Sequence, residues 1–382
     1  MGSEIEPQPT KATRVESRSA PRKTTGHKAT FYRPELDALR FFAFAAVLVH
    51  HGPDAPGFLG IARMAGGFGL SMFFLLSAYL ITELLLRERE QSGRIAWNLF
   101  FARRALRIWP LYYAALAVAI LIGRLHPAFW INGIGAAGMS VFISNWILGS
   151  SSLGLVGALW SISVEEQFYL IWPPIVWVGG ERLVLITSIF FAFCAGTWLW
   201  VFAARGWHLW YDTPVEFLFF GAGAVIALRT RGNMRSRSQL SRAAILIAGL
   251  VFLSVAARFS GVGTDRISGF TLAKLYTGYG AVVVGCAAIF IAFLGTPHVP
   301  RALIYLGRIS YGLYVFHEGI LELARWLTAP LKLPESSALN MLTVDALALL
   351  ICIPAAHLSY KYFEKPFLKL KQRFEVVKSR PV

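Results

Sequence analysis

Residues 36–51 read LDALRFFAFAAVLVHH, an apolar run with an arginine near one end and a histidine pair at the other. Apolar runs of this kind recur along the chain. Because about 20 mostly apolar residues cross a bilayer as one helix, and because backbone groups in lipid must be satisfied within their own segment, the pattern predicts an all-α, polytopic transmembrane helical bundle. The expected spans, about ten, cover residues 36–51, 67–87, 104–123, 162–178, 183–203, 213–229, 242–258, 272–294, 303–327 and 340–360.

The composition excludes an ordinary soluble protein. The 382 residues are 56% hydrophobic and 15% charged, whereas a soluble domain has about 25% charged residues. The net charge of +16 does not indicate nucleic-acid binding, because the basic residues lie beside apolar spans. The cysteines lie inside apolar stretches without metal-ligand or disulfide spacing. We therefore expect the lipid bilayer as a partner, no nucleic acid and no metal.

The loops predict the orientation. Arginines concentrate in the connections 87–107 and 229–242, whereas the alternate connections near 52–66, 205–213 and 328–337 carry fewer basic residues. Since basic loops stay in the cytoplasm, both termini are expected to be cytoplasmic in a multi-pass protein of the inner or plasma membrane. The weaker, glycine-rich stretch 134–148 is interpreted as a re-entrant or interfacial segment.

Three regions follow from this pattern. Residues 1–31 are polar and rich in lysine, arginine, proline and serine, which predicts a disordered basic cytoplasmic tail and not a secretory signal. Residues 32–367 form the transmembrane domain. Residues 368–382 are expected to be a second basic cytoplasmic tail.

The opening span carries the first candidate site residues. Arg40 and His51 are 11 positions apart, about three helical turns, so they share a face about 16 Å apart along the axis. His50 points about 100° away. A cation near the inner end and an imidazole near the outer end would suit a long ligand lying along this helix. The alternative is that Arg40 snorkels to the interface and the histidines only end the span.

A second constellation lies in ALWSISVEEQFYLIWP, residues 158–173. Glu165 and Glu166 open an aromatic span, and Ser161 shares a face with Glu165. A carboxylate here could orient a histidine for general-base catalysis. Acidic residues placed against the dipole of a helix N-terminus are the alternative.

Arginines mark the third segment, FFARRALRIWPLYY at residues 100–113. Arg104 and Arg107 are three positions apart and neighbours on one helical face, so their guanidiniums could grip a phosphorylated cosubstrate. Topogenic charge beside anionic lipid is an equally good explanation of the spacing.

Two further segments carry polar groups inside spans. GRISYGLYVFHEGI, residues 307–320, places His317 and Glu318 in the membrane, either for catalysis or as hydrogen-bonding groups across the bundle. SMFFLLSAYLIT, residues 71–82, carries hydroxyl residues that most often serve helix packing.

Together these segments resemble the acyltransferase 3 family of integral membrane acyltransferases, which includes O-antigen, exopolysaccharide and nodulation-factor acetylases and macrolide acylases. The resemblance covers nearly all of residues 32–367. Its ordered elements are an Arg-x10-His pair (Arg40, His51), an FFxLSG-type element (73–79), an RxxR-I-x-P element (104–110), a W-S-x-S-x-E-E-x-F-Y element (160–169), an S-Y-x-x-Y-x-x-H element (310–317) and an E-x-P-F element (364–367).

The resemblance implies roles for individual residues. His51 is the expected catalytic histidine and Arg40 its partner, while Arg104 and Arg107 serve acyl-CoA. Glu165 occupies the family's acidic position. Further candidates, on these same elements, are Glu166, His317, Ser161 and Trp160. Ala78 replaces the family's glycine, so Ser77 receives no catalytic role, and a stand-alone form without an added hydrolase-like domain is expected.

The expected function is therefore a membrane O-acyltransferase. It would move an acyl group, expected to be acetyl, from acyl-CoA to a hydroxyl of a carbohydrate, glycolipid or macrolide-like acceptor. His51 would act as general base with Glu165 holding its tautomer, and an acyl-histidine intermediate stays open. A secondary transporter of a small polar or anionic solute is the alternative, although no internal repeat is visible. A structural or signalling protein would leave the polar residues unexplained.

Overall fold

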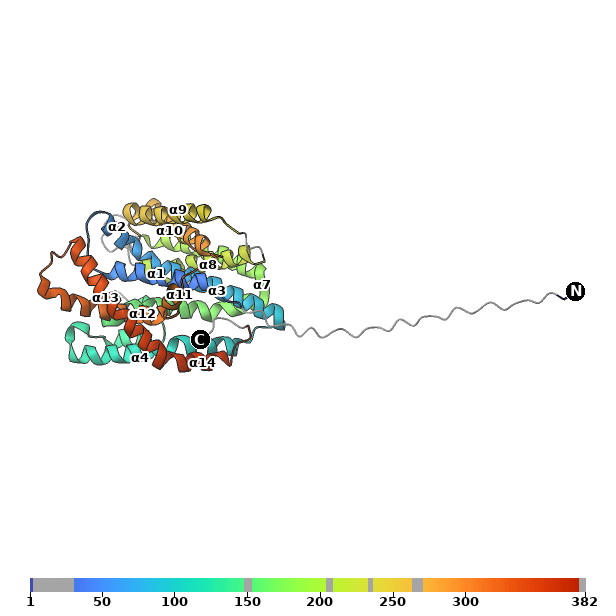
Figure 1. The fold of residues 1–382 in the computed structure, drawn as a ribbon, viewed down its shortest axis with the longest axis horizontal. Coiled ribbons are helices and arrows are strands. Elements are labelled where there is room, and N and C mark those ends of the chain that lie inside the picture. Colours follow the sequence, from blue (N-terminus) through green and yellow to red (C-terminus); the bar gives the residue numbers. More distant parts are fainter. Residues whose placement is uncertain (3–30, 148–152, 204–208, 233–235, 263–270, 378–382) are drawn as a thin grey trace.

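The computed structural model of the chain describes residues 1–2, 31–147, 153–203, 209–232, 236–262 and 271–377. Long helices run alongside one another to form a bundle, with α1 near its centre (Figure 1). The α-helices are α1 (Pro34–His51), α2 (Gly57–Gly66), α3 (Phe68–Ser92), α4 (Trp97–Leu125), α5 (Gly133–Ser140), α6 (Ser144–Ile147), α7 (Trp160–Val201), α8 (Thr213–Thr230), α9 (Gln239–Val255), α10 (Leu272–Phe293), α11 (Arg301–Arg308), α12 (Ser310–Thr328), α13 (Ala338–Leu358) and α14 (Lys365–Gln372). Short 3₁₀ or π turns extend or join them at η1 (Pro127–Phe129), η3 (Gly154–Leu159), η5 (Ala256–Ser260), η6 (Ala329–Leu331) and η7 (Ser359–Glu364).

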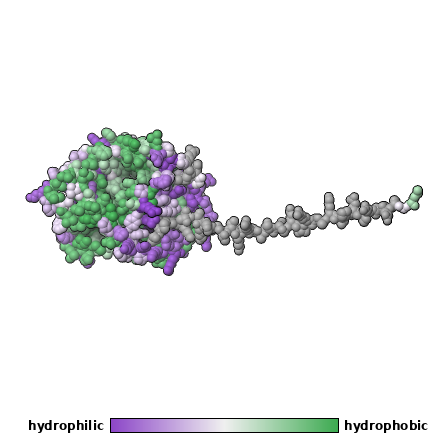
Figure 2. Space-filling view, in the orientation of Figure 1, coloured by the Kyte–Doolittle hydropathy of each residue, from purple (hydrophilic) through white to green (hydrophobic). Residues whose placement is uncertain are grey.

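The all-α membrane bundle predicted from the sequence is confirmed. Among the described residues, 7 helical segments are long and apolar enough to cross a membrane. Their outward faces suit lipid: on α7, Ile189 is 62% exposed and Phe193 is 68% exposed. Hydrophobic residues cover much of the visible face of the molecule, and hydrophilic residues gather toward the right of the view (Figure 2).

One of these segments is long enough for more than one crossing. Helix α7 has 42 residues but contains a non-helical residue, Gly180, with φ 52° and ψ −140°. A straight helix of that length would measure about 63 Å, twice the roughly 30 Å hydrocarbon thickness. Two crossings that meet at Gly180 match the predicted spans 162–178 and 183–203, because glycine adopts positive φ without a Cβ clash.

The predicted span at 303–327 is not one continuous helix. The structure has two helices, α11 and α12, separated at Ile309. The break lets α11 lie flat against α1: a Cβ on Gly307 would lie 1.7 Å from the backbone oxygen of Asp37. In contrast, the weak stretch 134–148 forms only the short helices α5 and α6 in its described part, so no crossing is added there.

Helices α1 and α12 carry too many polar residues to be among these 7 apolar segments. They nevertheless pack against each other inside the bundle. Adding them, and counting α7 twice, agrees with the predicted ten crossings. That number and the cytoplasmic placement of the termini stay predictions.

The end of the chain does not separate from the bundle where the sequence suggested. Helix α14 packs against α4 (Figure 1), and Leu368 and Val377 are buried. Part of the predicted tail 368–382 thus belongs to the folded domain. The predicted tail 1–31 lies outside the described residues except at its two ends.

Candidate active site

Predicted site residues from three helices, α1, α4 and α7, converge on one small cavity, the central pocket, of about 90 Å³. Helix α1 contributes Arg40, α4 contributes both predicted arginines, and α7 contributes the predicted acidic residue. The polar lining consists of Arg40, Ser77, Arg104, Arg107, Ser161, Glu165, Tyr169, Ser310, Tyr311 and Tyr314. The sequence therefore identified residues that are close in space although far apart along the chain.

A second cavity of about 90 Å³, the inner pocket, shares Arg40, Ser77, Arg104 and Arg107 with the central pocket. It adds Arg33, which the sequence analysis did not single out, and Lys371, which belonged to the predicted basic tail. Its ionisable lining residues are Tyr32, Arg33, Asp37, Arg40, Arg104, Arg107 and Lys371. The excess of cations over the Asp37 carboxylate makes this pocket suited to a polyanion.

The arginines of α4 have different partners. Arg103 is tied to the fold, since its guanidinium donates to Glu88 at 3.0 Å and to the Phe374 backbone oxygen at 2.8 Å. Arg104 instead lies over the ring of Tyr169, 5.5 Å from its centroid, and its buried Nε has no hydrogen-bond partner. A buried, unpartnered guanidinium nitrogen is costly, which is typical of a site that binds an anion.

Arg40 is held at the junction of the two pockets by its own helix. Its Nη1 donates to Asp37 Oδ1 at 3.1 Å, one turn earlier, and the Tyr32 hydroxyl donates to Asp37 Oδ2 at 2.8 Å. These contacts fix the guanidinium facing the bundle interior. The alternative that Arg40 merely snorkels to the interface does not fit this placement.

Glu165 is fully engaged by hydroxyl groups. Ser77 Oγ donates to Glu165 Oε1 at 2.7 Å, and the Tyr169 hydroxyl donates to Oε2 at 2.8 Å. The expected contact between Glu165 and His51 is therefore replaced by a different arrangement. Ser77, which received no catalytic role from its motif, is a direct partner of this carboxylate.

His51 is the last residue of α1. Its Nδ1 is 2.9 Å from the Val47 backbone oxygen. Because a carbonyl oxygen can only accept, Nδ1 carries the proton in neutral His51, and Nε2 keeps its lone pair. Nε2 faces Glu318 Oε1 at 3.9 Å, and the two side chains are 34% and 23% exposed. The His51 side chain is thus partly exposed, and its unprotonated Nε2 lies beside a carboxylate.

Glu318 is fixed by the segment that precedes α7. The backbone N–H of Ala158 donates to Glu318 Oε2 at 2.9 Å, which leaves Oε1 facing His51. The sequence singled out the pair His317–Glu318 but could not assign this pairing, because it depends on which helices are neighbours.

A row of rings connects the central pocket with His51. Tyr314, which lines the pocket, has its ring 5.2 Å from that of His317, and the His317 ring is 5.0 Å from that of His51. Ser161 Oγ and the Tyr314 hydroxyl are 2.7 Å apart. His317 is fully buried, with Nδ1 against the Tyr314 backbone oxygen and no partner at Nε2.

The remaining candidates lie outside this row. Trp160 is buried with its ring 4.7 Å from that of Tyr211, which is a packing role. Glu166 follows Glu165 on α7 but is absent from the described lining of both pockets, and its Oε1 has no hydrogen-bond partner. His50 Nδ1 is 3.1 Å from the Arg63 backbone oxygen, so His50 faces α2 and not α12.

Fold and site together define a polytopic helical membrane protein with an internal cationic pocket and a partly exposed histidine. The family described as Acyltransferase domain matches residues 33–357, and the chain belongs to that family.

Similar proteins include "Peptidoglycan O-acetyltransferase OatA" of Listeria monocytogenes, 28% identical over 91% of this chain and 57% of the relative. "Putative peptidoglycan O-acetyltransferase YrhL" of Bacillus subtilis is 28% identical over 90% of this chain and 56% of the relative. "Putative O-acetyltransferase SAS0844" of Staphylococcus aureus is 24% identical over 90% of this chain and 59% of the relative. The chain thus spans a little over half the length of these relatives. No solved structure matches it.

Proposed function

We propose that this protein is a membrane O-acyltransferase that moves an acetyl group from acetyl-CoA to a hydroxyl of a carbohydrate. The observation that carries the proposal is the placement of two groups on one helix: Arg40 in the cationic pockets and His51 beside Glu318. Cations at one end suit the phosphates of the donor, and a base at the other suits the acceptor hydroxyl.

The donor would bind through the inner pocket. Coenzyme A carries several phosphate charges, and Arg33, Arg104, Arg107 and Lys371 line this cavity. Arginine pairs with phosphate through two parallel N–H bonds, and lysine acts as a point charge. The pantetheine arm would extend through the central pocket toward His51. Tyr314 and His317 stand between them, so their rings would have to turn aside for the thioester to pass.

The chemical step is a direct transfer. His51 Nε2 takes the proton of the acceptor hydroxyl while that oxygen attacks the thioester carbonyl. The new C–O bond forms, the C–S bond breaks, and the leaving thiolate receives the proton from the imidazolium to give free CoA. Glu318 would stabilise the imidazolium through its charge, and Glu165, held by Ser77 and Tyr169, would keep the neighbouring guanidiniums in place.

A carbohydrate acceptor is favoured by the names of the relatives, two of which refer to peptidoglycan O-acetylation. The exposure of His51 supports this, since a third of its side-chain surface is open, as approach of a bulky acceptor requires.

The test uses membrane vesicles with the cytoplasmic face outward, containing soluble peptidoglycan fragments. Radiolabelled acetyl-CoA is added outside, and both CoA release and label in the trapped glycan are measured. We expect label transfer that His51→Gln abolishes and the matched His50→Gln largely keeps. Equal transfer by the two variants would refute the role of His51. Solute flux without thioester would instead favour a transporter.

A further inference from the structure

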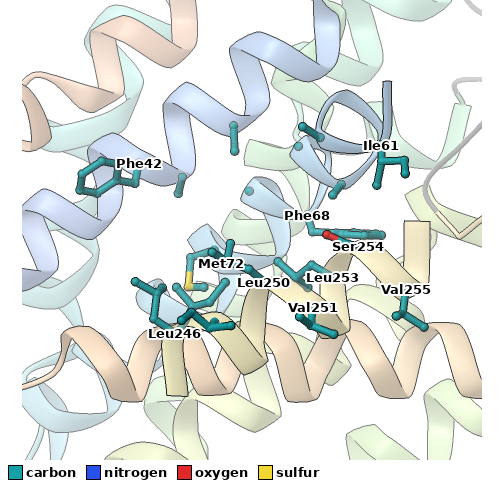
Figure 3. Close-up of a pocket in the computed structure, with 18 of the residues that line it drawn as sticks. Phe42, Ile61, Phe68, Met72, Leu246, Leu250, Val251, Leu253, Ser254 and Val255 are labelled. Carbon is teal, nitrogen blue, oxygen red and sulfur yellow. The ribbon is translucent and has the colours of Figure 1, made fainter. Parts of the chain in front are cut away.

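A large apolar cavity lies on the opposite side of α1 from α12. Its volume is about 950 Å³, at the upper end of the range of ligand pockets. Side chains of α1, α2, α3 and α9 line one common space, including Phe42, Ile61, Met72 and Leu250 (Figure 3). We call this space the α9 groove. None of the proposed donor or base residues lines it in the described part of the chain.

The chemistry of the lining changes along the groove. From Leu246 to Val255 the described lining residues of α9 are apolar except Ser254. Arg258, in η5, is the one charged residue among the described lining residues. Its guanidinium lies 5.5 Å from the centroid of the Phe259 ring, and it makes no ion pair among the described residues. An apolar trough with a cation at one end matches a long-chain lipid with an anionic head group.

The depth of these residues in the membrane agrees with a bound lipid. Leu246 is seven residues from the start of α9 and Arg258 nineteen, about 10 Å and 28 Å along the axis. Arg258 therefore sits close to one face of a hydrocarbon layer about 30 Å thick, and Leu246 lies within it. Under the predicted orientation, that face is the extracytoplasmic one, because α9 starts next to the basic connection 229–242.

We propose that the α9 groove binds an anionic glycerophospholipid, with an acyl chain between α1 and α9 and the phosphate at Arg258. A phospholipid fits better than a free anion because the lining is apolar over most of its length. Small residues keep the wall open where the chain would lie, among them Ala43, Ala62 and Ala65. The proposal does not depend on the acyl-transfer reaction.

The experiment measures bound lipid. The full chain is reconstituted in nanodiscs of equal parts phosphatidylcholine and phosphatidylglycerol, extracted, and analysed by native mass spectrometry. We expect retained phosphatidylglycerol, lowered about tenfold by Arg258→Glu and kept by Arg258→Lys. The control Arg301→Glu makes the same charge change at an exposed site outside the groove and should retain the lipid.

A second pair tests the chain-binding part without changing charge. Ser254→Trp fills the groove and should also displace the lipid, whereas Ala248→Trp, on an exposed face of α9 outside the lining, should not. Equal retention by Arg258→Glu and Arg301→Glu would overturn the proposal. Retention of a polyprenyl phosphate in preference to phosphatidylglycerol, when both are supplied equally, would overturn the choice of lipid.

Discussion

Replacing Glu318 by glutamine removes the charge beside His51 and little else. The amide oxygen can still accept from the Ala158 N–H, so the side chain keeps its position. Two unit charges 3.9 Å apart interact by about 1 kcal/mol in bulk water and about 4 kcal/mol at an effective dielectric constant of about 20. Both side chains are partly exposed, so we expect an intermediate loss of about 2 kcal/mol in transition-state stabilisation, about 30-fold in kcat.

The assay is acetyl-CoA-dependent CoA release in reconstituted membranes, with kcat and the KM for acetyl-CoA measured separately. Because Glu318 would act on the imidazolium and not on the donor, KM should change little. The matched control is Glu322→Gln, one turn along α12, where the carboxylate is 46% exposed and pairs with Arg325. A loss of less than twofold in Glu318→Gln, or equal losses in both variants, would refute the proposed stabilisation of the imidazolium.

Three further predictions follow from the packing and the pockets. His51→Ala should lower kcat by about 100-fold or more with normal protein levels in the membrane, as radiolabel transfer would report. If the buried guanidinium of Arg104 binds phosphate, Arg104→Gln should raise the KM for acetyl-CoA by about tenfold. The KM for a donor lacking the 3′-phosphate should rise by less. Gly307→Ala should lower stability by about 1–3 kcal/mol, because its Cβ would overlap α1. Gly319→Ala, with nothing within 4 Å of the added carbon, should leave the thermal unfolding temperature in detergent unchanged or slightly higher.

Hydropathy predicted the positions of the main helices because membrane-spanning segments must be both long and apolar. It could not detect the break at Ile309, which separates α12 from α11, the short helix packed closely against α1. Hydropathy also gave no reason to place Leu368 and Val377 within the fold, because their burial comes from packing of the chain end against the bundle.

The motifs identified Arg40, Arg104 and Glu165 as site residues, but the sequence analysis expected Glu165 beside His51, whereas in the structure all three line the central pocket. The neighbour of His51 could not be predicted from the sequence. Glu318 faces His51 only because α12 packs beside α1, and the order of spans along a chain does not determine which helices touch. Lys371 was not predicted to line a pocket for a different reason. A basic residue after the last span is typical of an ordinary topogenic charge.

The polar character of α1 and α12 has a consequence for synthesis. Neither is apolar enough to count as a membrane crossing alone, and α1 is made first whereas α12 emerges near the end. Until α12 arrives, His51 at the end of α1 lacks the Glu318 carboxylate that faces it in the finished protein. A chain truncated before α12 would therefore leave a polar helix without one of its packing partners in the membrane, where exposed ionisable groups are costly.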